Sequence, residues 1–272
     1  EHNQGMEVIP QILTSDPEDF LDTAVKLKEY GYTEVNLNLG CPSGTVAAKG
    51  KGAGFLKDTE KLARFLGEVS EGMERENLHF SIKTRVGVES EEEFQTLLGL
   101  YNQCPLTELI IHPRVLKDFY KYNVRMNAFK EGFEKSRHSV CYNGDIFRRK
   151  DYDRLVKEYP DLDKIMMGRG IMMNPFLMEE IADGTSQKVS GKMSAARKAD
   201  RLEKFHRLLC DGYTHVMSGD RPVLFKMKEL WGFLIHSCPE EEKLMKKIRK
   251  AQHLAEYEGV VSELFCRMRE HE

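Results

Sequence analysis

Short apolar runs alternate with amphipathic stretches along the chain up to about residue 180. An apolar run of a few residues predicts a buried strand, whereas apolar positions three and four apart predict a helix with one buried face. The runs predict six strands, at residues 8–13, 34–40, 79–86, 108–113, 139–143 and 164–168. Helices are predicted between them, at residues 17–30, 59–72, 90–101 and 149–159. This alternation is typical of a parallel α/β sheet.

After about residue 185 the pattern becomes helical throughout. Helices are predicted at residues 195–217, 223–237, 240–255 and 262–269. Asp220-Arg221-Pro222 and Cys238-Pro239 separate them, because proline interrupts a helix. We therefore predict two domains, an α/β domain at residues 1–185 and an all-α helical bundle at residues 186–272.

Two α/β architectures compete for the first domain. An open doubly wound sheet can have six strands, whereas a TIM (β/α)8 barrel has eight. No Gly-x-Gly-x-x-Gly follows the first strand, which weakens the dinucleotide-binding alternative. The chain also opens on Glu1 and leads directly into a strand. A TIM barrel whose first two strands are absent from these residues explains both the count of six strands and the opening of the chain on a strand. It is the fold that we expect.

Composition narrows the class of protein. Six cysteines are scattered among 272 residues without Cys-x-x-Cys spacing, which argues against a zinc site and against a secreted disulfide framework. No apolar run approaches the roughly 18 residues of a membrane span, and no signal peptide is visible. We expect a cytoplasmic monomer that needs neither a metal nor a membrane.

The charge is distributed unevenly along the chain. The net charge of the whole chain is −3, but residues 191–272 hold 16 Lys and Arg against 13 Asp and Glu, a net charge of +3. By itself such a basic segment indicates only a solvated helical surface.

The most informative residues lie where the second predicted strand ends. The run 35–39 passes into Gly40-Cys41-Pro42-Ser43, so Cys41 occupies a turn at the strand's carboxyl end. Chemistry in α/β enzymes gathers at such ends. A free thiol has a pKa near about 8.5, so Cys41 can act as a nucleophile or as a proton donor, or can be a small buried residue. Asn38 is a polar residue in the same apolar run and needs a partner, which a ligand can supply.

Two further strands end in residues that can carry chemistry. Lys83 and Arg85 are two residues apart and therefore point to the same face of the third strand. Two cations on one face suit an anionic or electron-rich ligand. His112 ends the fourth strand and is followed by Arg114. A lone Lys or His of this kind is often structural, but three successive strands ending in Cys, Lys and His indicate a site.

The last two strands carry glycine-containing turns. Asn143-Gly144-Asp145 follows one strand and Gly168-Arg169-Gly170 follows the next. In a barrel these are strands seven and eight, the usual place of a phosphate site. Glycine lets backbone N–H groups approach phosphate oxygens, and Arg169 adds a fork of donors.

Together these stretches resemble the tRNA-dihydrouridine synthases. The likeness runs in order and spacing over about residues 8–180. It is carried by Gln11, Asn38 to Ser43, Lys83, His112-Pro113-Arg114, Asn143-Gly144-Asp145, Gly168-Arg169-Gly170 and Asn174-Pro175. The Asn-x-Gly-Cys-Pro-Ser signature is the specific part. The family's Ala-Pro-Met segment, which lines the flavin, is absent from residues 1–272.

The resemblance implies an FMN-dependent TIM barrel followed by a helical tRNA-binding domain. Reduced FMN would pass a hydride to C6 of a uridine, Cys41 would protonate C5, and NADPH would reduce the flavin. Asn38 and Arg114 would contact the uracil or the RNA. The remaining motif residues would hold FMN: Gln11, Lys83 and His112 its ring and ribityl chain, and Asn143, Gly144, Asp145, Gly168 and Arg169 its phosphate.

The resemblance also gives the basic C-terminal helices a partner, since phosphate contacts to a folded tRNA need such patches. The residues concerned are Arg197, Lys198, Arg201, Lys204, Lys226, Lys228, Lys243, Lys246, Lys247, Arg249 and Lys250. The glycine- and lysine-rich segment 47–54 is either a mobile lid or a flexible connection.

Three other functions remain open. One is an FMN-dependent barrel oxidoreductase that acts on a small pyrimidine and does not need the basic extension. Another is an aldolase that forms a Schiff base through Lys83. The third is a non-catalytic RNA-binding protein.

Overall fold

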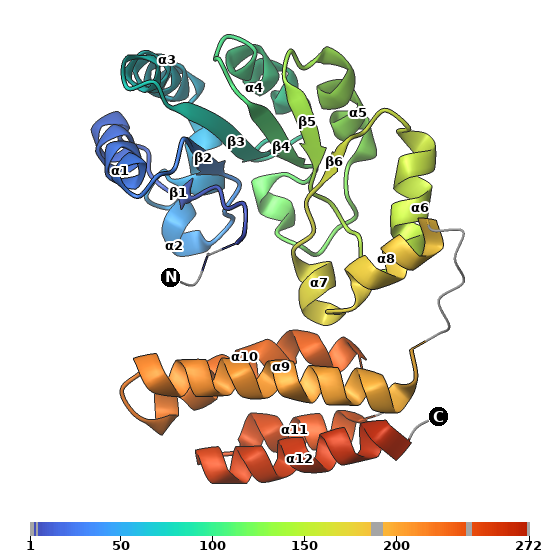
Figure 1. Cartoon of the computed structure of the whole chain (residues 1–272). Coiled ribbons are helices and arrows are strands. Elements are labelled where there is room, and N and C mark those ends of the chain that lie inside the picture. Colours follow the sequence, from blue (N-terminus) through green and yellow to red (C-terminus); the bar gives the residue numbers. More distant parts are fainter. Residues whose placement is uncertain (1–2, 4, 186–192, 238–240, 271–272) are drawn as a thin grey trace. The chain divides into compact units, whose positions relative to one another are not determined.

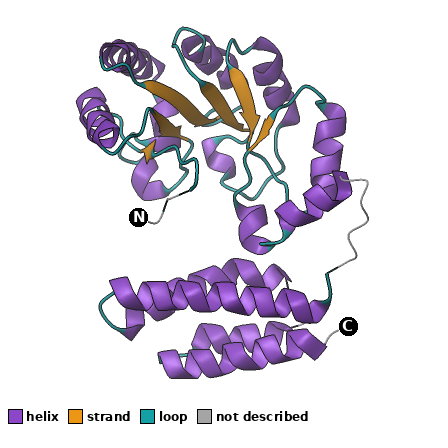
Figure 2. Cartoon of the chain, in the orientation of Figure 1, coloured by secondary structure: helices purple, strands orange, loops and turns teal. Residues whose placement is uncertain are grey.

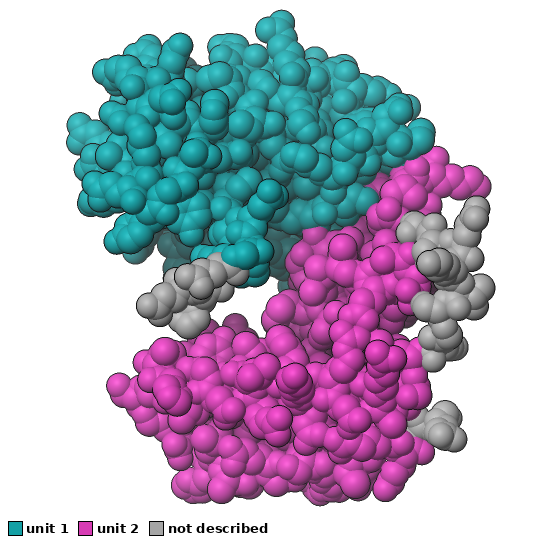
Figure 3. All heavy atoms as spheres, viewed as in Figure 1, with its two compact units in different colours: residues 1–144, 159–166 teal, residues 145–158, 167–272 magenta. Residues whose placement is uncertain are grey.

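A computed structural model of the chain describes residues 3, 5–185, 193–237 and 241–270. It divides into two compact units (Figure 3). The first unit comprises residues 1–144 and 159–166, and the second comprises residues 145–158 and 167–272. Each unit is described by itself below.

The first unit is built on a parallel sheet (Figures 1 and 2). Its six strands are β1 Gln11–Ile12, β2 Glu34–Leu39, β3 His79–Arg85, β4 Glu108–His112, β5 Ser139–Tyr142 and β6 Lys164–Ile165. Every neighbouring pair is parallel, and the spatial order is the order along the chain. A doubly wound sheet reverses its order at a switch point. Sequential order is that of a βα barrel, so the predicted barrel-type α/β fold with a helical C-terminal region is confirmed.

Helices cover one side of this sheet (Figure 1). They are α1 Pro17–Glu29, α3 Thr59–Arg75, α4 Glu93–Tyr101 and α5 Met126–Lys135. Asp16 caps α1 by accepting a hydrogen bond from the Asp19 backbone N–H at 3.1 Å, as the Asp-Pro start predicts. The side chains between the helices and the sheet are apolar, with Phe20, Phe65 and Phe80 in edge-to-face contact.

The sequence-based prediction missed α5. Tertiary packing, and not helix propensity, accounts for its Gly132. A Cβ at Gly132 would lie 2.5 Å from Ile111 Cδ1 and 2.9 Å from Phe94 Cε1. The helix therefore approaches the sheet more closely than any other residue at that position would allow.

The glycine-rich segment 47–54 has a defined structure. Residues Gly44–Ala47 form the short helix α2, and Gly52–Lys57 form the 3-10 helix η1. Ala53, Phe55 and Leu56 of η1 are buried. Residues 48–51 lie between these two helices, and a role of the segment as a lid or as a connection stays a prediction.

The second unit consists of helices. They are α6 Arg149–Glu158, α7 Arg169–Met173, α8 Leu177–Thr185, α9 Ala195–Val216, α10 Asp220–Leu234, α11 Glu242–Lys250 and α12 Leu254–Glu270, with the 3-10 helix η3 Ile235–Ser237. The break predicted around residues 256–261 lies instead at 251–253, and Cys238-Pro239 lies outside the described residues. The predicted domain limit falls at the end of α8 and stays a prediction.

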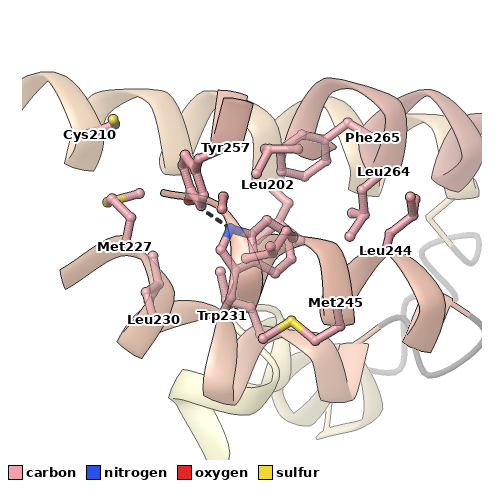
Figure 4. Close-up of a cluster of buried hydrophobic side chains, with 14 of the residues drawn as sticks. Leu202, Cys210, Met227, Leu230, Trp231, Leu244, Met245, Tyr257, Leu264 and Phe265 are labelled. Carbon is pink, nitrogen blue, oxygen red and sulfur yellow. Dashed lines mark hydrogen bonds between the residues drawn. The ribbon is translucent and has the colours of Figure 1, made fainter. Parts of the chain in front are cut away.

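Three polar side chains are hydrogen-bonded to one another within the apolar core of α9 to α12, and Figure 4 shows the bond between Trp231 and Tyr257. The Trp231 Nε1–H donates to Tyr257 Oη at 2.9 Å, and Tyr257 Oη lies 2.5 Å from His206 Nε2. Burial lowers the pKa of His206 to about 4, so its imidazole is neutral at neutral pH. Since the indole N–H can only donate, the Tyr257 hydroxyl accepts from Trp231 and donates to His206.

Candidate active site at the carboxyl edge of the sheet

The strand register places the predicted site residues on one face of the sheet. Asn38 pairs with Lys83, and Arg85 pairs with His112. Residues that pair in parallel strands point to the same face, and residues two apart on one strand share it. Cys41 follows β2 by two residues, so it lies at the carboxyl edge beside these side chains. The structure thus brings together the Cys, Lys and His that end three successive strands.

Asn38 shapes the turn that contains Cys41. Its Oδ1 accepts from the backbone N–H groups of Gly40 and Cys41, both at 3.0 Å. Its Nδ2 donates to Gln11 Oε1 at 2.7 Å. Both the oxygen and the nitrogen of the Asn38 amide therefore have protein partners. The partner that this polar residue needs is supplied by the turn and by Gln11.

Two polar residues that the sequence-based prediction left out extend this network. Gln11 Nε2 donates to Asn36 Oδ1 at 2.7 Å, and Asn36 Nδ2 donates to Ser81 Oγ at 2.9 Å. The signal that could have revealed them is the strict alternation of residues 35–39, in which apolar side chains alternate with Asn36 and Asn38. One face of β2 is therefore polar and lies toward the site.

Gly52 packs directly against Cys41. Its φ is +57°, and a Cβ there would lie 2.8 Å from the Cys41 carbonyl oxygen and 2.9 Å from Cys41 Cβ. The following residue, Ala53, donates its N–H to that same carbonyl at 3.0 Å. The first two residues of the 3-10 helix η1 thus pack against the Cys41 turn and hold it in place.

Replacing Gly52 with alanine is expected to displace Cys41 and to lower activity by about 10-fold or more, because misplacing a reacting group by even an ångström is costly. Gly50 is the matched control: its φ is +64°, but a Cβ there meets nothing within 4 Å. Gly50→Ala carries the same backbone strain without the collision. Equal turnover of the two variants in steady-state assays would contradict this assignment.

Lys83 is a cation in an unfavourable place. Burial, and then the neighbouring Arg85 charge, lower the pKa of Lys83 to about 8. Lys83 therefore keeps most of its charge at neutral pH and releases its proton more readily than an exposed lysine.

His112 is neutral in this environment. Burial and the Arg85 charge, with smaller contributions from Lys83 and Arg114, lower the pKa of His112 to about 3. Its Nδ1–H donates to the Asn143 carbonyl oxygen at 2.5 Å. This bond leaves Nε2 as an acceptor, 3.5 Å from Arg114 Nη1.

Two buried arginines hold the loops around the site. Arg85 is 1% exposed and donates to three backbone carbonyls, those of Gly40 at 3.0 Å and of Val115 and Phe119 at 2.8 Å. Arg114 is 2% exposed, and its Nε donates to the Tyr122 carbonyl at 2.7 Å. A contact between Arg114 and substrate stays a prediction. The sequence predicted that Arg85 and Lys83 together face an anionic or electron-rich ligand, whereas the structure gives the Arg85 guanidinium three backbone carbonyls as partners.

The predicted phosphate residues divide between the two units. In the first unit, Asn143 Nδ2 donates to the Met166 carbonyl at 2.9 Å, and Gly144 is required because a Cβ would lie 2.0 Å from Tyr142 Oη. In the second unit, Asp145 pairs with Arg169 at 2.6 Å. A Cβ at Gly168 would meet nothing within 4 Å. Packing therefore explains Gly144 and leaves Gly168 without a steric reason.

Many of the basic side chains on the C-terminal helices have acidic partners. Arg201 pairs with Glu179 at 2.5 Å, and Lys198 pairs with Glu180 at 3.4 Å. Lys226, Lys246 and Lys247 also pair with glutamates. Exposed pairs of this kind are weak and can be exchanged for phosphate, but they reduce the net positive potential of the surface.

The described residues offer neither a metal cluster nor a helix suited to a membrane. Among residues 3, 5–185, 193–237 and 241–270 there is no group of three or more His, Cys, Asp or Glu side chains that could hold a metal ion. In the same part of the chain, no helix combines the length and the apolar character needed to cross a bilayer.

Comparison with known proteins identifies relatives. A family model described as dihydrouridine synthase matches residues 1–266. A probable tRNA-dihydrouridine synthase of Staphylococcus aureus (strain Mu50) is 31% identical over 179 residues, which cover 64% of this chain and 53% of that protein. The corresponding protein of Staphylococcus epidermidis (strain ATCC 12228) is 30% identical over 210 residues, covering 73% and 63%.

The chain thus spans roughly half to two thirds of the length of these curated relatives. A solved structure of morphinone reductase is similar with a TM-score of 0.44 and 17% identity, covering 62% of this chain and 48% of that one. These values are too low to support a conclusion.

Proposed function

Because the chain belongs to the dihydrouridine synthase family, we propose that it is part of an enzyme that reduces a uridine of tRNA to 5,6-dihydrouridine. The observation that carries this proposal is the Cys41 turn, which Asn38 holds at the carboxyl edge of the sheet beside Lys83 and His112. A half-buried thiol in a defined turn, next to a cationic strand, suits proton donation to a ligand at that edge.

The residues present fit a flavin. Lys83, Arg85 and Arg114 form a group of cations. Burial and then the Arg85 charge lower the pKa of Lys83, and burial, with a smaller contribution from Arg114, lowers that of Arg85. Such a group favours an anionic or electron-rich ligand, because the ligand relieves the repulsion. FMN, when bound, would supply the hydride that reaches C6 of the uracil.

The side chains of this chain would complete the reaction. Hydride addition at C6 places negative charge on C5 and O4, and the Cys41 S–H would deliver the proton that forms the new C5–H bond. Asn38 would orient that thiol through its bonds to the Gly40 and Cys41 N–H groups. Lys83 would stabilise the electron-rich ring, and neutral His112 would offer Nε2 as an acceptor.

Other parts of the proposal extend beyond this edge. Gln11 would contribute to the flavin site, and Asn143, Gly144, Asp145, Gly168 and Arg169 would hold the phosphate. NADPH would serve as the reductant. We assign residues 1–185 to the catalytic domain and residues 186–272 to tRNA binding through the basic helices, with the chain acting as a monomer in the cytoplasm.

One observation favours a second function. A lysine whose pKa falls to about 8 is a better nucleophile than an exposed lysine, as a Schiff-base aldolase requires. Borohydride in the presence of an aldehyde or ketone substrate would trap an adduct on Lys83 if that function were correct.

We expect the full-length protein to purify yellow, with flavin absorbance, and to form dihydrouridine in tRNA when NADPH is supplied. Dihydrouridine is measured by mass spectrometry of digested tRNA, and parallel reactions with NADH give the cofactor preference. A free pyrimidine nucleoside is the control substrate. A colourless protein, or reduction of the free pyrimidine but not of tRNA, would contradict the proposal.

A further inference from the structure

Three aromatic side chains stand exposed just beyond the candidate active site. Phe119, Tyr120 and Tyr122 follow β4 and are 45%, 50% and 64% exposed. All three lie within the segment 115–125, which we call the aromatic loop. Aromatic side chains that gather in solvent commonly mark a binding surface.

The aromatic loop is held in place by buried charged groups. Arg85 donates to the carbonyls of Val115 and Phe119, and Arg114 donates to that of Tyr122. Asp118 accepts from the Val115 N–H at 3.1 Å and from Arg125 at 2.9 and 3.0 Å. Side chains presented by a loop with these bonds lose little further freedom when they bind a partner.

The backbone at Phe119 is strained. Its φ is +48°, a conformation that bulky side chains rarely adopt. Such strain persists only where the surroundings enforce it, and it concentrates at functional sites. At Phe119 the enforcing contact is the hydrogen bond from Arg85 to its carbonyl.

Arg85 connects the aromatic loop to the Cys41 turn. The Arg85 guanidinium lies 5.2 Å from the centroid of the Tyr120 ring, while its Nε donates to the Gly40 carbonyl beside Cys41. The Tyr120 ring also meets the His112 ring edge-to-face at 5.8 Å. Tyr120 therefore contacts two residues of the site, while half of its side chain remains exposed.

We infer that the aromatic loop is a stacking platform for unpaired bases of the RNA substrate, with Tyr120 beside the target uridine and Phe119 and Tyr122 on flanking bases. This inference rests on the proposed function. A uridine inside a folded RNA must leave its stack to be reduced, and an aromatic face replaces the stacking that it loses. Lys117 and Lys121 of the aromatic loop are also exposed, and Lys117 lies in an exposed pair with Glu89, so both can meet the phosphates of an RNA strand.

The test replaces each of the three aromatic residues with leucine in the full-length protein. Tyr30→Leu is the matched control: Tyr30 is 82% exposed, but it lies between α1 and β2, at the amino edge of the sheet. Loss of one base–aromatic contact is expected to weaken equilibrium binding of tRNA by about 5- to 100-fold. Tyr120→Leu is expected to have the largest effect, and Tyr120→Phe to restore binding because it keeps the ring.

Several readouts separate this inference from its rivals. Flavin content and thermal midpoint are expected to match those of Tyr30→Leu, which excludes misfolding. Wild-type tRNA affinity in all three leucine variants would overturn the inference. The loop would then be a surface for some other ligand, such as a protein. If the protein forms no dihydrouridine but the leucine variants still lose tRNA affinity, the stacking platform stands and the proposed reaction fails.

Discussion

Cys41→Ala is expected to lower the rate of uridine reduction by about 10²- to 10⁴-fold, the usual contribution of a positioned general acid. The physical reason is that the charge developing at C5 and O4 of the uracil would have only water as a proton source. Flavin content is expected to remain unchanged, since Lys83 and His112 lie on other strands. Single-turnover mixing of reduced enzyme with tRNA measures the reduction step directly.

Two controls sharpen this prediction. Cys41→Ser keeps the size of the side chain but provides a much weaker acid, so it is expected to remain close to the alanine variant. Cys266→Ala removes an exposed thiol on α12 and is expected to retain full activity. Undiminished turnover in Cys41→Ala would remove Cys41 from the mechanism.

Arg85→Met is expected to lower the free energy of unfolding by about 3–5 kcal/mol, because it leaves the carbonyls of Gly40, Val115 and Phe119 without their donor and each unsatisfied buried group costs roughly 1–3 kcal/mol. Methionine fills a similar length with no donor. Activity is expected to fall with stability, since the catalytic turn and the aromatic loop both lose an anchor. Urea denaturation followed by circular dichroism measures the change.

Arg64→Met is the matched control for this substitution. Arg64 is exposed on α3, so its loss is expected to change stability by no more than about 0.5 kcal/mol. Arg85→Lys keeps a positive charge but offers no planar fork, and it is expected to fall between the two. An Arg85→Met protein as stable as Arg64→Met would show that the three carbonyls find other partners.

The positions of the strands along the chain and the residues at their ends were predictable from local pattern. Buried strands need continuous or alternating apolar residues, and parallel strands align their carboxyl ends, so Cys41, Lys83 and His112 could be expected at one edge. Helix α5 was missed, and the glycine at its position 132 is explained only by Ile111 and Phe94, which approach it from other elements. The 3-10 helix at residues 52–57 was not predicted either, because its Gly52 is explained only by the close packing against Cys41.

By itself, the sequence determined the βα alternation, the helical C-terminal region and the identity of the thiol, the lysine and the histidine at three strand ends. These depend on periodicity and on residue type, which are local properties. Tertiary structure decided what these groups have as neighbours: the Asn38 bonds that shape the Cys41 turn, the burial that brings the pKa of Lys83 to about 8 and that of His112 to about 3, and the Arg85 contacts that tie the aromatic loop to the site. Burial, electrostatic repulsion and hydrogen-bond partners arise between segments far apart in the chain, so only the folded arrangement could supply them.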